Sequence, residues 1–363
     1  MTRTRYVVEF LNKGNWEESS VCRPCETAEE AEALRQKHFG RRASAYHTRV
    51  RKVKSATMGN LIESHVRTPG RATVLLPPGL GDIHWVFLKL EGFLSRHGFT
   101  GADAWIWDVG GPRRSAEFVQ RVPFVHYVDY INIPDRYDRR DVHNFCQQTN
   151  PVMPNTFGFD FVIAFNGLLE AGLPLDTAMD GASINWHYPI IQTEEECRFA
   201  QLEKEKGPWV LLYFSSLGRV FNQWTEIITP NRVIELIRLI KSTYPHHRVK
   251  MVGLPWDEGF SDRIQGVEFE NLVGKTNPDE YFALLRGAEA MVGFANGNGI
   301  LATHFGVPTV MIWNRERYPH MAFRTNWVSP HSRYLPVEIE DFNPSQIIDA
   351  LNNMTDKQVS VHV

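Results

Sequence analysis

The sequence has few cysteines and no long hydrophobic run, and each absence excludes a class of protein. Four cysteines in 363 residues are too few and too scattered for a disulfide framework, which favours a reducing compartment. No apolar run approaches the roughly 18 residues that a membrane helix needs. The N-terminus also lacks the apolar core and the cleavage site of a signal peptide. We therefore expect a cytoplasmic protein without a transmembrane segment.

Metal-binding and redox motifs are also scarce. Cys22 and Cys25 have C-x-x-C spacing, but no second C-x-x-C or H-x-x-H pair completes a tetrahedral set of ligands. We interpret the pair as part of a turn. The sequence contains no internal repeat and no low-complexity tract, and its apolar content of 43% is enough to bury two cores.

Charge is distributed unevenly along the chain. Residues 1–71 contain 14 lysines and arginines against 8 glutamates, a net charge of +6, and the whole chain carries −3, which leaves −9 for the remainder. A basic arm of this kind could meet an acidic polymer or an anionic surface, although such runs are usually solvated faces.

The order of predicted elements indicates an α/β protein with two Rossmann-like, doubly wound domains that face a cleft. We expect a small basic α+β appendage over 1–56, βαβ-like in its order of elements, and a linker over 57–71. An N-terminal Rossmann-like domain over 72–207 and a C-terminal one over 208–340 follow, and a C-terminal helix and tail over 341–363 end the chain. The final helix, about 344–353, is expected to pack across the first of these domains.

Individual elements follow from apolar runs and capping residues. In the appendage we expect strands over 5–11 and 45–53, and a helix over 27–38 with Thr27 and Glu30 as its capping box. The predicted strands of the two domains are 72–76, 104–107, 125–131, 159–164, 209–214, 248–252, 268–272 and 290–294. The predicted helices are 82–96, 115–121, 231–243 and 278–286. Residues 132–157 are expected to be a long loop.

Glycines follow the strand 290–294 in the turn Asn296-Gly297-Asn298-Gly299, and a helix begins directly after them. The first amides of a helix have no internal partner and carry partial positive charge, so a diphosphate suits this position. An ordinary packing turn with small residues explains the same pattern. Loops after the strands of both sheets should converge on the cleft, where doubly wound sheets bind their ligands.

The motifs together resemble glycosyltransferases of the GT-B fold, family 9, which are similar to ADP-heptose lipopolysaccharide heptosyltransferases. The resemblance covers residues 72 to about 314. It rests on the turn Leu76-Pro77-Pro78-Gly79-Leu80-Gly81-Asp82-Ile83-His84, on the segment LLYFSSLGRVFNQW, on Gly274-Lys275-Thr276 and on Gly306–Val310. It implies two Rossmann-like domains, transfer of a sugar from a nucleotide-diphosphate sugar, and an aspartate base in the G-D turn.

Several positions depart from the family pattern. Where members usually carry D-[ST]-G-x-x-H, this chain has residues 295–300, so the acidic sugar ligand and the histidine are missing, and a lysine expected near the tryptophan is Asn222. Arg219 could supply that charge from the same loop. These changes put the heptose in doubt more than nucleotide binding.

Two residues are candidates for the general base that activates the acceptor hydroxyl. Asp82 lies at the opening of a predicted helix on the cleft side, although an aspartate there can simply cap the helix. His84 has a suitable side chain, but it lies one position away from the family's histidine and can be a packed neighbour instead. No D-x-D motif occurs in the second domain, so we expect neither an obligatory metal nor a cofactor beyond the nucleotide sugar.

Further residues are predicted to bind the two substrates. For the sugar donor these are Ser215, Ser216, Arg219, Asn222, Gly253, Lys275, Thr276, Asn296, Gly297, Asn298 and Gly299. For the acceptor they are Gly81, Arg113 and Arg315.

The favoured function is therefore metal-independent sugar transfer to an acceptor hydroxyl, and the resemblance implies that the transfer inverts the configuration of the sugar. The acceptor could be a glycan, a lipid-linked sugar or a hydroxymethylated DNA base. The alternatives are a GT-B-type sugar-nucleotide epimerase and a catalytically inactive protein that binds nucleotide sugars. The sequence does not indicate an oligomeric state.

Overall fold

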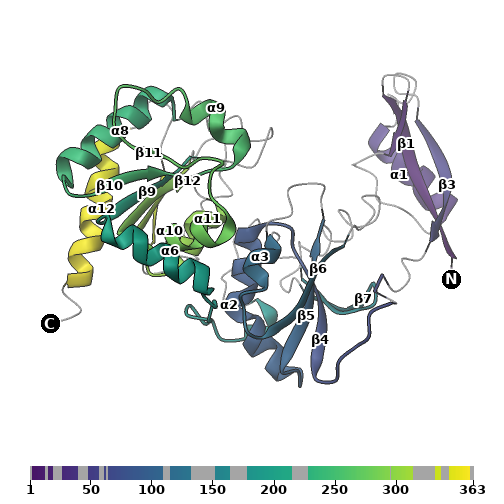
Figure 1. The fold of residues 1–363 in the computed structure, drawn as a ribbon. Helices are drawn as coiled ribbons and strands as arrows, with labels where there is room; N and C mark the ends of the chain where they lie inside the picture. Colours follow the sequence, from purple (N-terminus) through teal and green to yellow (C-terminus); the bar gives the residue numbers. More distant parts are fainter. Residues whose placement is uncertain are drawn as a thin grey trace.

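The computed structural model describes residues 2–12, 15–18, 27–39, 48–56, 61–62, 64–108, 115–131, 152–163, 178–214, 228–294, 296–313, 332–336 and 343–359. These residues form three β-sheets: a small one at the N-terminus and two larger ones, each with helices packed on it (Figure 1). The prediction of two Rossmann-like α/β domains is confirmed. No helix within the described ranges is both long enough and apolar enough to span a membrane.

The N-terminal sheet has the expected order of strand, helix and strand, with one strand more. It contains β1 (Thr2–Asn12), β2 (Asn15–Glu18) and β3 (Thr48–Ala56), and α1 (Ala28–Phe39) contacts β1 and β3. Both β2 and β3 pair antiparallel with β1, whereas a true βαβ unit has parallel strands. Thr27 caps α1, because its hydroxyl accepts a hydrogen bond of 3.1 Å from the Glu30 amide.

The first large sheet has the strand order β6-β5-β4-β8-β7. Its four parallel strands are β4 (Arg71–Leu76), β5 (Gly101–Trp107), β6 (Val125–Ile131) and β8 (Phe159–Ile163). The fifth strand, β7 (Val152–Thr156), runs antiparallel to β8. The expectation of a loop over 132–157 was therefore wrong for 152–156, and residues 132–151 lie outside the described residues. A short strand that contains a proline is tolerated at the edge of a sheet, where its missing N–H is not needed.

Helices cover one face of this sheet, and a smaller apolar cluster covers the other. On the helical face lie α2 (Leu80–Arg96) and the short α3 (Ser115–Val119), whose apolar sides join the main core. We call the opposite face of the sheet the outer face. A separate buried cluster covers it and consists of Ile62, Leu75, Trp105, Phe159 and Val162. The 3-10 turn η3 (Met179–Gly181) packs against α2.

The second large sheet is fully parallel, with the order β11-β10-β9-β12-β13-β14. Numbered from its own first strand, this order is 3-2-1-4-5-6, the dinucleotide-binding topology. The strands are β9 (Trp209–Tyr213), β10 (Arg248–Met251), β11 (Glu270–Asn271), β12 (Ala290–Phe294), β13 (Thr309–Trp313) and β14 (Ser332–Pro336). A nucleotide site is expected beyond the carboxyl end of β9, β10 and β12.

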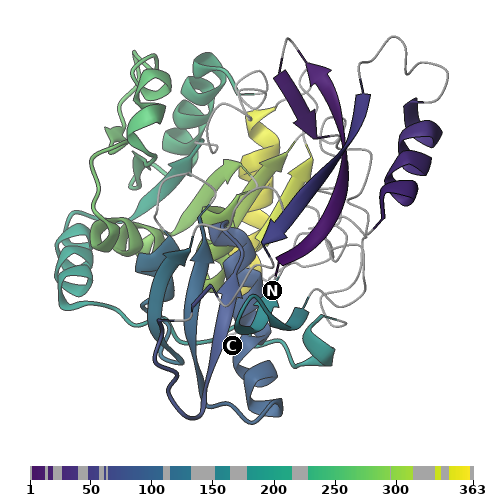
Figure 2. The same cartoon turned by 90° about the vertical axis from the view of Figure 1, so that its right-hand side faces the viewer.

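The helices of the second domain are α6 (Glu194–Glu205), α8 (Pro230–Thr243), α9 (Glu258–Ser261), α10 (Pro278–Gly287), α11 (Gly297–His304) and α12 (Pro344–Val359), with the 3-10 turn η4 (Pro255–Asp257). Although α6 precedes the boundary expected at residue 208, it packs against α10. The final helix α12 packs against α8 and contacts β13, and both views place it beside the second sheet (Figures 1 and 2). The expectation that it crosses the first domain was wrong.

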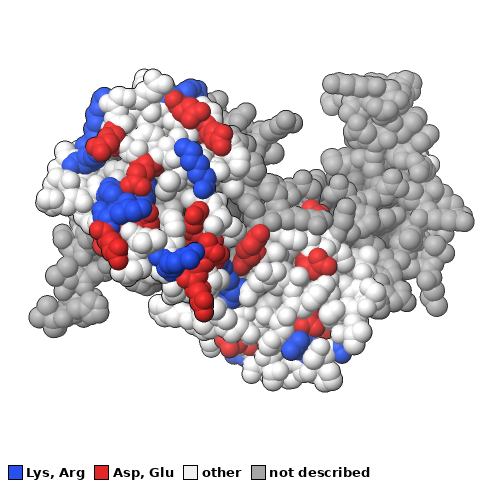
Figure 3. Space-filling view, viewed as in Figure 1, with Lys and Arg blue, Asp and Glu red and all other residues white. Residues whose placement is uncertain are grey.

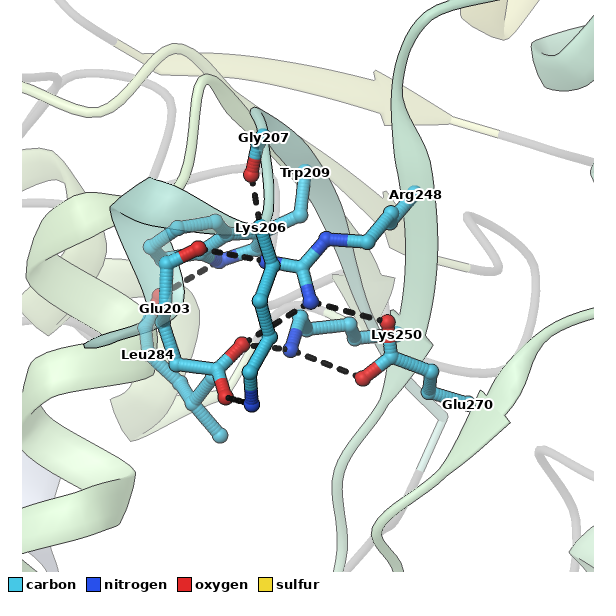
Figure 4. Close-up of polar contacts among 8 residues, drawn as sticks. All are labelled: Glu203, Lys206, Gly207, Trp209, Arg248, Lys250, Glu270 and Leu284. Atoms are coloured by element: carbon cyan, nitrogen blue, oxygen red, sulfur yellow. Dashed lines mark hydrogen bonds and ion pairs between the residues drawn. The ribbon is translucent and has the colours of Figure 1, made fainter. Parts of the chain in front are cut away.

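A buried network of charges fastens α6 to the second sheet (Figure 4). The Lys250 side chain, 1% exposed, forms ion pairs with Glu203 of α6 and, at 2.9 Å, with Glu270. Arg248 reaches the same two carboxylates at 3.0 and 3.1 Å. Burial by itself would raise the pKa of Glu203, but hydrogen bonds from Lys206 and Lys250 lower it to about 2. Arg248 is the first residue of β10, so the network lies at the end of the sheet opposite the expected ligand site.

Candidate functional site

The amino-terminal ends of two helices from different domains meet at the cleft. Helix α2 follows β4 through a turn of two prolines and Gly79, and α11 follows β12 through Asn296. A Cβ atom added to Gly297 would lie 2.6 Å from the backbone nitrogen of Gly81. Only two glycines permit the backbones to approach this closely. The positive ends of both helix dipoles therefore lie together.

A pocket of about 210 Å³ opens beside this contact and is lined by residues of both domains. The first domain contributes Leu80, Glu117 and Phe118, from the starts of α2 and α3. The second domain contributes Tyr213, the last residue of β9, and residues that follow its other strands: Gly253, Leu254, Pro255, Gly274, Thr276, Asn277, Pro278, Tyr281, Phe282 and Asn298. We call this space the cleft pocket.

The structure brings some of the predicted donor-binding residues together and places others elsewhere. Gly253, Thr276 and Asn298 all line the cleft pocket, although they follow three different strands. Lys275 is exposed, and its ammonium group donates a hydrogen bond of 3.0 Å to the carbonyl oxygen of Asn271. The other predicted binding residues, Ser215, Ser216, Arg219, Asn222, Arg113 and Arg315, lie outside the described residues.

Asn296 is the N-cap of α11. Its side-chain oxygen accepts hydrogen bonds from the amides of Asn298 and Gly299, at 3.0 and 3.2 Å. Two of the amides expected to bind a diphosphate are therefore already satisfied. A phosphate can reach them only if the Asn296 side chain turns away, whereas the attraction of the helix dipole does not depend on that movement.

Asp82 lies in the first turn of α2, one residue beyond the contact between Gly81 and Gly297. One carboxylate oxygen of Asp82 is 2.6 Å from the position that a Cβ of Gly79 would occupy, so the side chain folds back over the N-cap residue. Asp82 is partly exposed and lies at the carboxyl end of the first sheet. A base for the acceptor requires this kind of position.

His84 points into the core instead. The residue is 1% exposed, and its Nδ1 lies 2.7 Å from the hydroxyl oxygen of Tyr188. Its ring is 5.2 Å from the ring of His304 in α11. Burial, and secondly His304, hold the pKa of His84 well below 6.5. A general base must contact the substrate, and the imidazole of His84 is too buried in this structure to do so.

Contacts that sequence reasoning missed hold the two domains together. Arg121, just after α3, forms ion pairs with the buried Glu196 of α6 and, at 2.6 Å, with Asp279 of α10. Phe118 stacks on Phe282 with ring centroids 6.5 Å apart. Arg121 is separated from Glu196 by 75 positions and from Asp279 by 158, and no motif in the sequence links them.

Residues 182–193 lead from the first domain into α6, and hydrogen bonds along this segment attach it to the first domain. The amide of Asn185 donates to the carbonyl oxygen of Leu88, and that of Ile191 to Arg121, each at 2.7 Å. Between them, Tyr188 is 1% exposed, and its ring lies 4.3 Å from that of His304. Burial raises the pKa of Tyr188 well above 10.

Charged side chains of both signs alternate over the described surface of the second domain in the view of Figure 3, and few charged groups appear on that of the first. In the part of the chain that the structure describes, no three His, Cys, Asp or Glu residues are grouped so that they could hold a metal ion. Metal independence stays a prediction.

Comparison with solved structures identifies proteins of the same fold. The ADP-heptose lipopolysaccharide heptosyltransferase II of E. coli is similar over 79% of this chain and 99% of its own, with a TM-score of 0.55 and 15% sequence identity. A family 9 glycosyl transferase from Veillonella parvula is similar over 79% of this chain and 97% of its own, with a TM-score of 0.50 and 13% identity. No family model matches the sequence, and a search of curated proteins finds no match. At such low identity the likeness shows a shared fold.

Proposed function

We propose that the protein transfers a sugar from a nucleotide-diphosphate sugar to an acceptor hydroxyl, as a divergent relative of the family 9 glycosyltransferases. The observation that carries the proposal is the meeting of two helix amino termini at a pocket shared by two Rossmann-like domains. Negative charge grows on the leaving diphosphate during transfer, and aligned helix dipoles stabilise it. The fold shared with a heptosyltransferase supports the same function.

In this proposal the nucleoside lies in the cleft pocket and the diphosphate near the ends of α2 and α11. Gly253 and Thr276 border the nucleoside, and Asn298 borders the diphosphate. Arg219 adds positive charge, so that no metal is required. Asp82 removes the proton from the acceptor hydroxyl while the sugar carbon is attacked from the side opposite the diphosphate, which inverts the configuration. We assign no role in proton transfer to His84.

A protein that binds nucleotide sugars without transferring the sugar is the second candidate. The observation that favours it is the cap on α11, because Asn296 already occupies two amides that would stabilise the charge growing on a leaving diphosphate during transfer. The two candidates differ in what Asp82 does. A transferase needs its carboxylate for turnover but not for nucleotide binding.

The test compares Asp82→Asn with Glu91→Gln, a change of the same kind at an exposed position on the same helix. Thermal unfolding is measured with a panel of UDP-, ADP-, GDP- and CMP-sugars, because a ligand that binds only the folded protein raises the melting temperature. Turnover of the stabilising sugar nucleotide is then followed by release of the nucleoside diphosphate. We expect Asp82→Asn to keep the thermal shift and to lose about 100-fold or more of the turnover, with Glu91→Gln unchanged. No thermal shift with any nucleotide would refute both candidates, and full turnover by Asp82→Asn would refute the assigned base.

A further inference from the structure

The outer face of the first sheet contains a hollow of about 320 Å³, distinct from the cleft pocket. It lies where the edge strand β6 meets the segment after residue 60, and Ser64, His65, Trp105, Tyr127, Asp129 and Tyr130 are among its lining residues. None of these residues lines the cleft pocket, and the mechanism proposed above does not use them. We call this space the outer hollow.

Aromatic rings form the apolar part of the outer hollow. The rings of Trp105 and Tyr127 lie with their centroids 5.2 Å apart, and His65 meets Trp105 edge-on at 4.7 Å. Tyr127 is 38% exposed, whereas Trp105 on the adjacent strand is almost completely buried. An exposed aromatic ring that packs against a buried one is a rigid contact surface for a partly apolar ligand.

Hydrogen bonds fix the polar groups of the outer hollow in place, and the carboxylate of Asp129 is an acceptor among them. Asp129 accepts hydrogen bonds from the Tyr127 hydroxyl at 3.1 Å and from the Tyr130 amide at 2.7 Å. His65 donates from Nε2 to the buried carboxylate of Asp103 at 2.9 Å, because that carboxylate can only accept. This bond fixes the orientation of the imidazole ring.

Charge then decides what kind of ligand the outer hollow suits. Of the described residues that line it, none is lysine or arginine, and Asp129 is acidic. A phosphate or another anion would be repelled there. A neutral sugar ring matches both features, since its hydroxyl groups donate to carboxylates and its C–H face packs on an aromatic ring.

The outer hollow and the cleft pocket lie on the two faces of the edge strand β6. Tyr130 borders the outer hollow, but its side chain packs on the main core at the helical face, where its hydroxyl accepts from the amide of Ala116 at 3.1 Å. Glu117 and Phe118, the next two residues of α3, line the cleft pocket. The two spaces therefore lie on opposite faces of the first sheet, with β6 and the start of α3 between them.

We propose that the outer hollow binds a neutral sugar ring of the acceptor, so that the acceptor is a glycan that extends from the cleft over the edge strand β6. The assignment of this sugar to the acceptor rests on the proposed function, whereas the binding of a sugar at Tyr127 does not. DNA or an anionic lipid as the acceptor would place phosphates against Asp129.

The experiment measures binding of the full chain to an array of defined oligosaccharides. The array contains neutral oligomers of glucose, galactose, mannose and N-acetylglucosamine, together with sialylated and amino-sugar oligomers of the same length. The variants are Tyr127→Ala, which removes the platform, and Tyr127→Phe, which keeps the ring and loses only its hydroxyl. Thr100→Ala, at an exposed position in the same domain, is the control.

We expect neutral oligosaccharides to bind, with about fivefold to tenfold weaker binding by Tyr127→Ala and a smaller loss with Tyr127→Phe. Binding by Thr100→Ala should be unchanged, and added salt should have little effect. Preference for the positively charged or sialylated oligomers, neutral binding that Tyr127→Ala leaves intact, or no binding at all would overturn the proposal. The nucleotide thermal shift is measured on the same samples. It should persist in Tyr127→Ala, and its absence together with intact sugar binding would remove the proposed function while leaving the sugar site.

Discussion

Replacement of Gly297 by alanine should separate the two domains at the cleft. The added Cβ would lie 2.6 Å from the Gly81 nitrogen, 3.2 Å from the Gly81 Cα and 3.2 Å from the Leu80 Cβ. Normal contacts between such atoms are about 3.5 Å or longer, so α2 and α11 must move apart by roughly 1 Å. None of these three atoms is at the end of a flexible side chain, so the backbone itself must move. Overpacking of this kind costs about 1–3 kcal/mol.

The assay is thermal unfolding of three alanine variants with and without the stabilising nucleotide. Gly81→Ala places its Cβ 3.0 Å from the Gly297 Cα and 3.2 Å from the Ile300 Cδ1, a milder overlap. Gly259→Ala meets no atom within 4 Å, and in helix α9 it should be neutral or slightly stabilising. The melting temperature should fall most in Gly297→Ala, less in Gly81→Ala and not in Gly259→Ala. The nucleotide shift should shrink in the same order. If Gly297→Ala melts like Gly259→Ala and binds nucleotide normally, the two helix termini do not meet as described.

Two further predictions concern buried charge and pH. Lys250→Ala removes the buried cation between Glu203 and Glu270, while Arg248 and Lys206 still pair with Glu203, and it should cost up to about 3 kcal/mol in urea unfolding. Lys206→Ala, at a side chain 60% exposed, should cost less than about 1 kcal/mol, and equal losses would contradict the buried network. Burial lowers the pKa of His304 to about 4 and that of His84 below 6.5, so the unfolded chain binds protons first as the pH falls. The contribution of these two histidines to stability should therefore be constant above pH 6.5 and should fall as the pH drops from 6.5 to 4, by up to about 3 kcal/mol from His304. Melting curves across this range should show His304→Asn losing less than the wild type, and a parallel loss in both would refute the assignment.

The buried strands could be predicted from the sequence because strands covered on both faces are continuous apolar runs. Residues 290–294, all of them buried, were predicted with their observed bounds. Residues 125–131 were also predicted with their observed bounds, although β6 is an edge strand in which only Val125 is buried. Helix α6 was not predicted, because its two buried residues are Glu196 and Glu203. A buried glutamate is indistinguishable from a surface one until its partners, Arg121 and Lys250, are known. Charged residues held inside by ion pairs therefore conceal an element from analysis of apolar periodicity.

The candidate site could be predicted in outline but not in its contacts. The convergence of Gly253, Thr276 and Asn298 follows from the rule that ligands bind at the carboxyl ends of parallel strands. Asp82 is partly exposed at the cleft and His84 is buried, and this difference depends on which side of α2 faces the second domain. The sequence does not give the rotation of α2 about its axis. The side-chain cap by Asn296 could have been inferred from asparagine directly before a helix, because asparagine is a preferred N-cap.

Residues 182–193, which connect the two domains, have a consequence for how fast a ligand enters and leaves the cleft. Hydrogen bonds also join this connection to α10 of the second domain, from the Thr193 hydroxyl to Asp279 at 2.7 Å and from Arg286 to the Ile190 carbonyl oxygen at 3.4 Å. A wide swing of the two domains would break these bonds and would separate the rings of Tyr188 and His304. Such an opening resembles local unfolding rather than free rotation about a flexible linker. Because the cleft is assembled beforehand, a ligand loses little additional conformational entropy when it binds. Entry and release should then proceed by small movements of the loops at the rim, and loosening residues 182–193 should speed release at the expense of affinity.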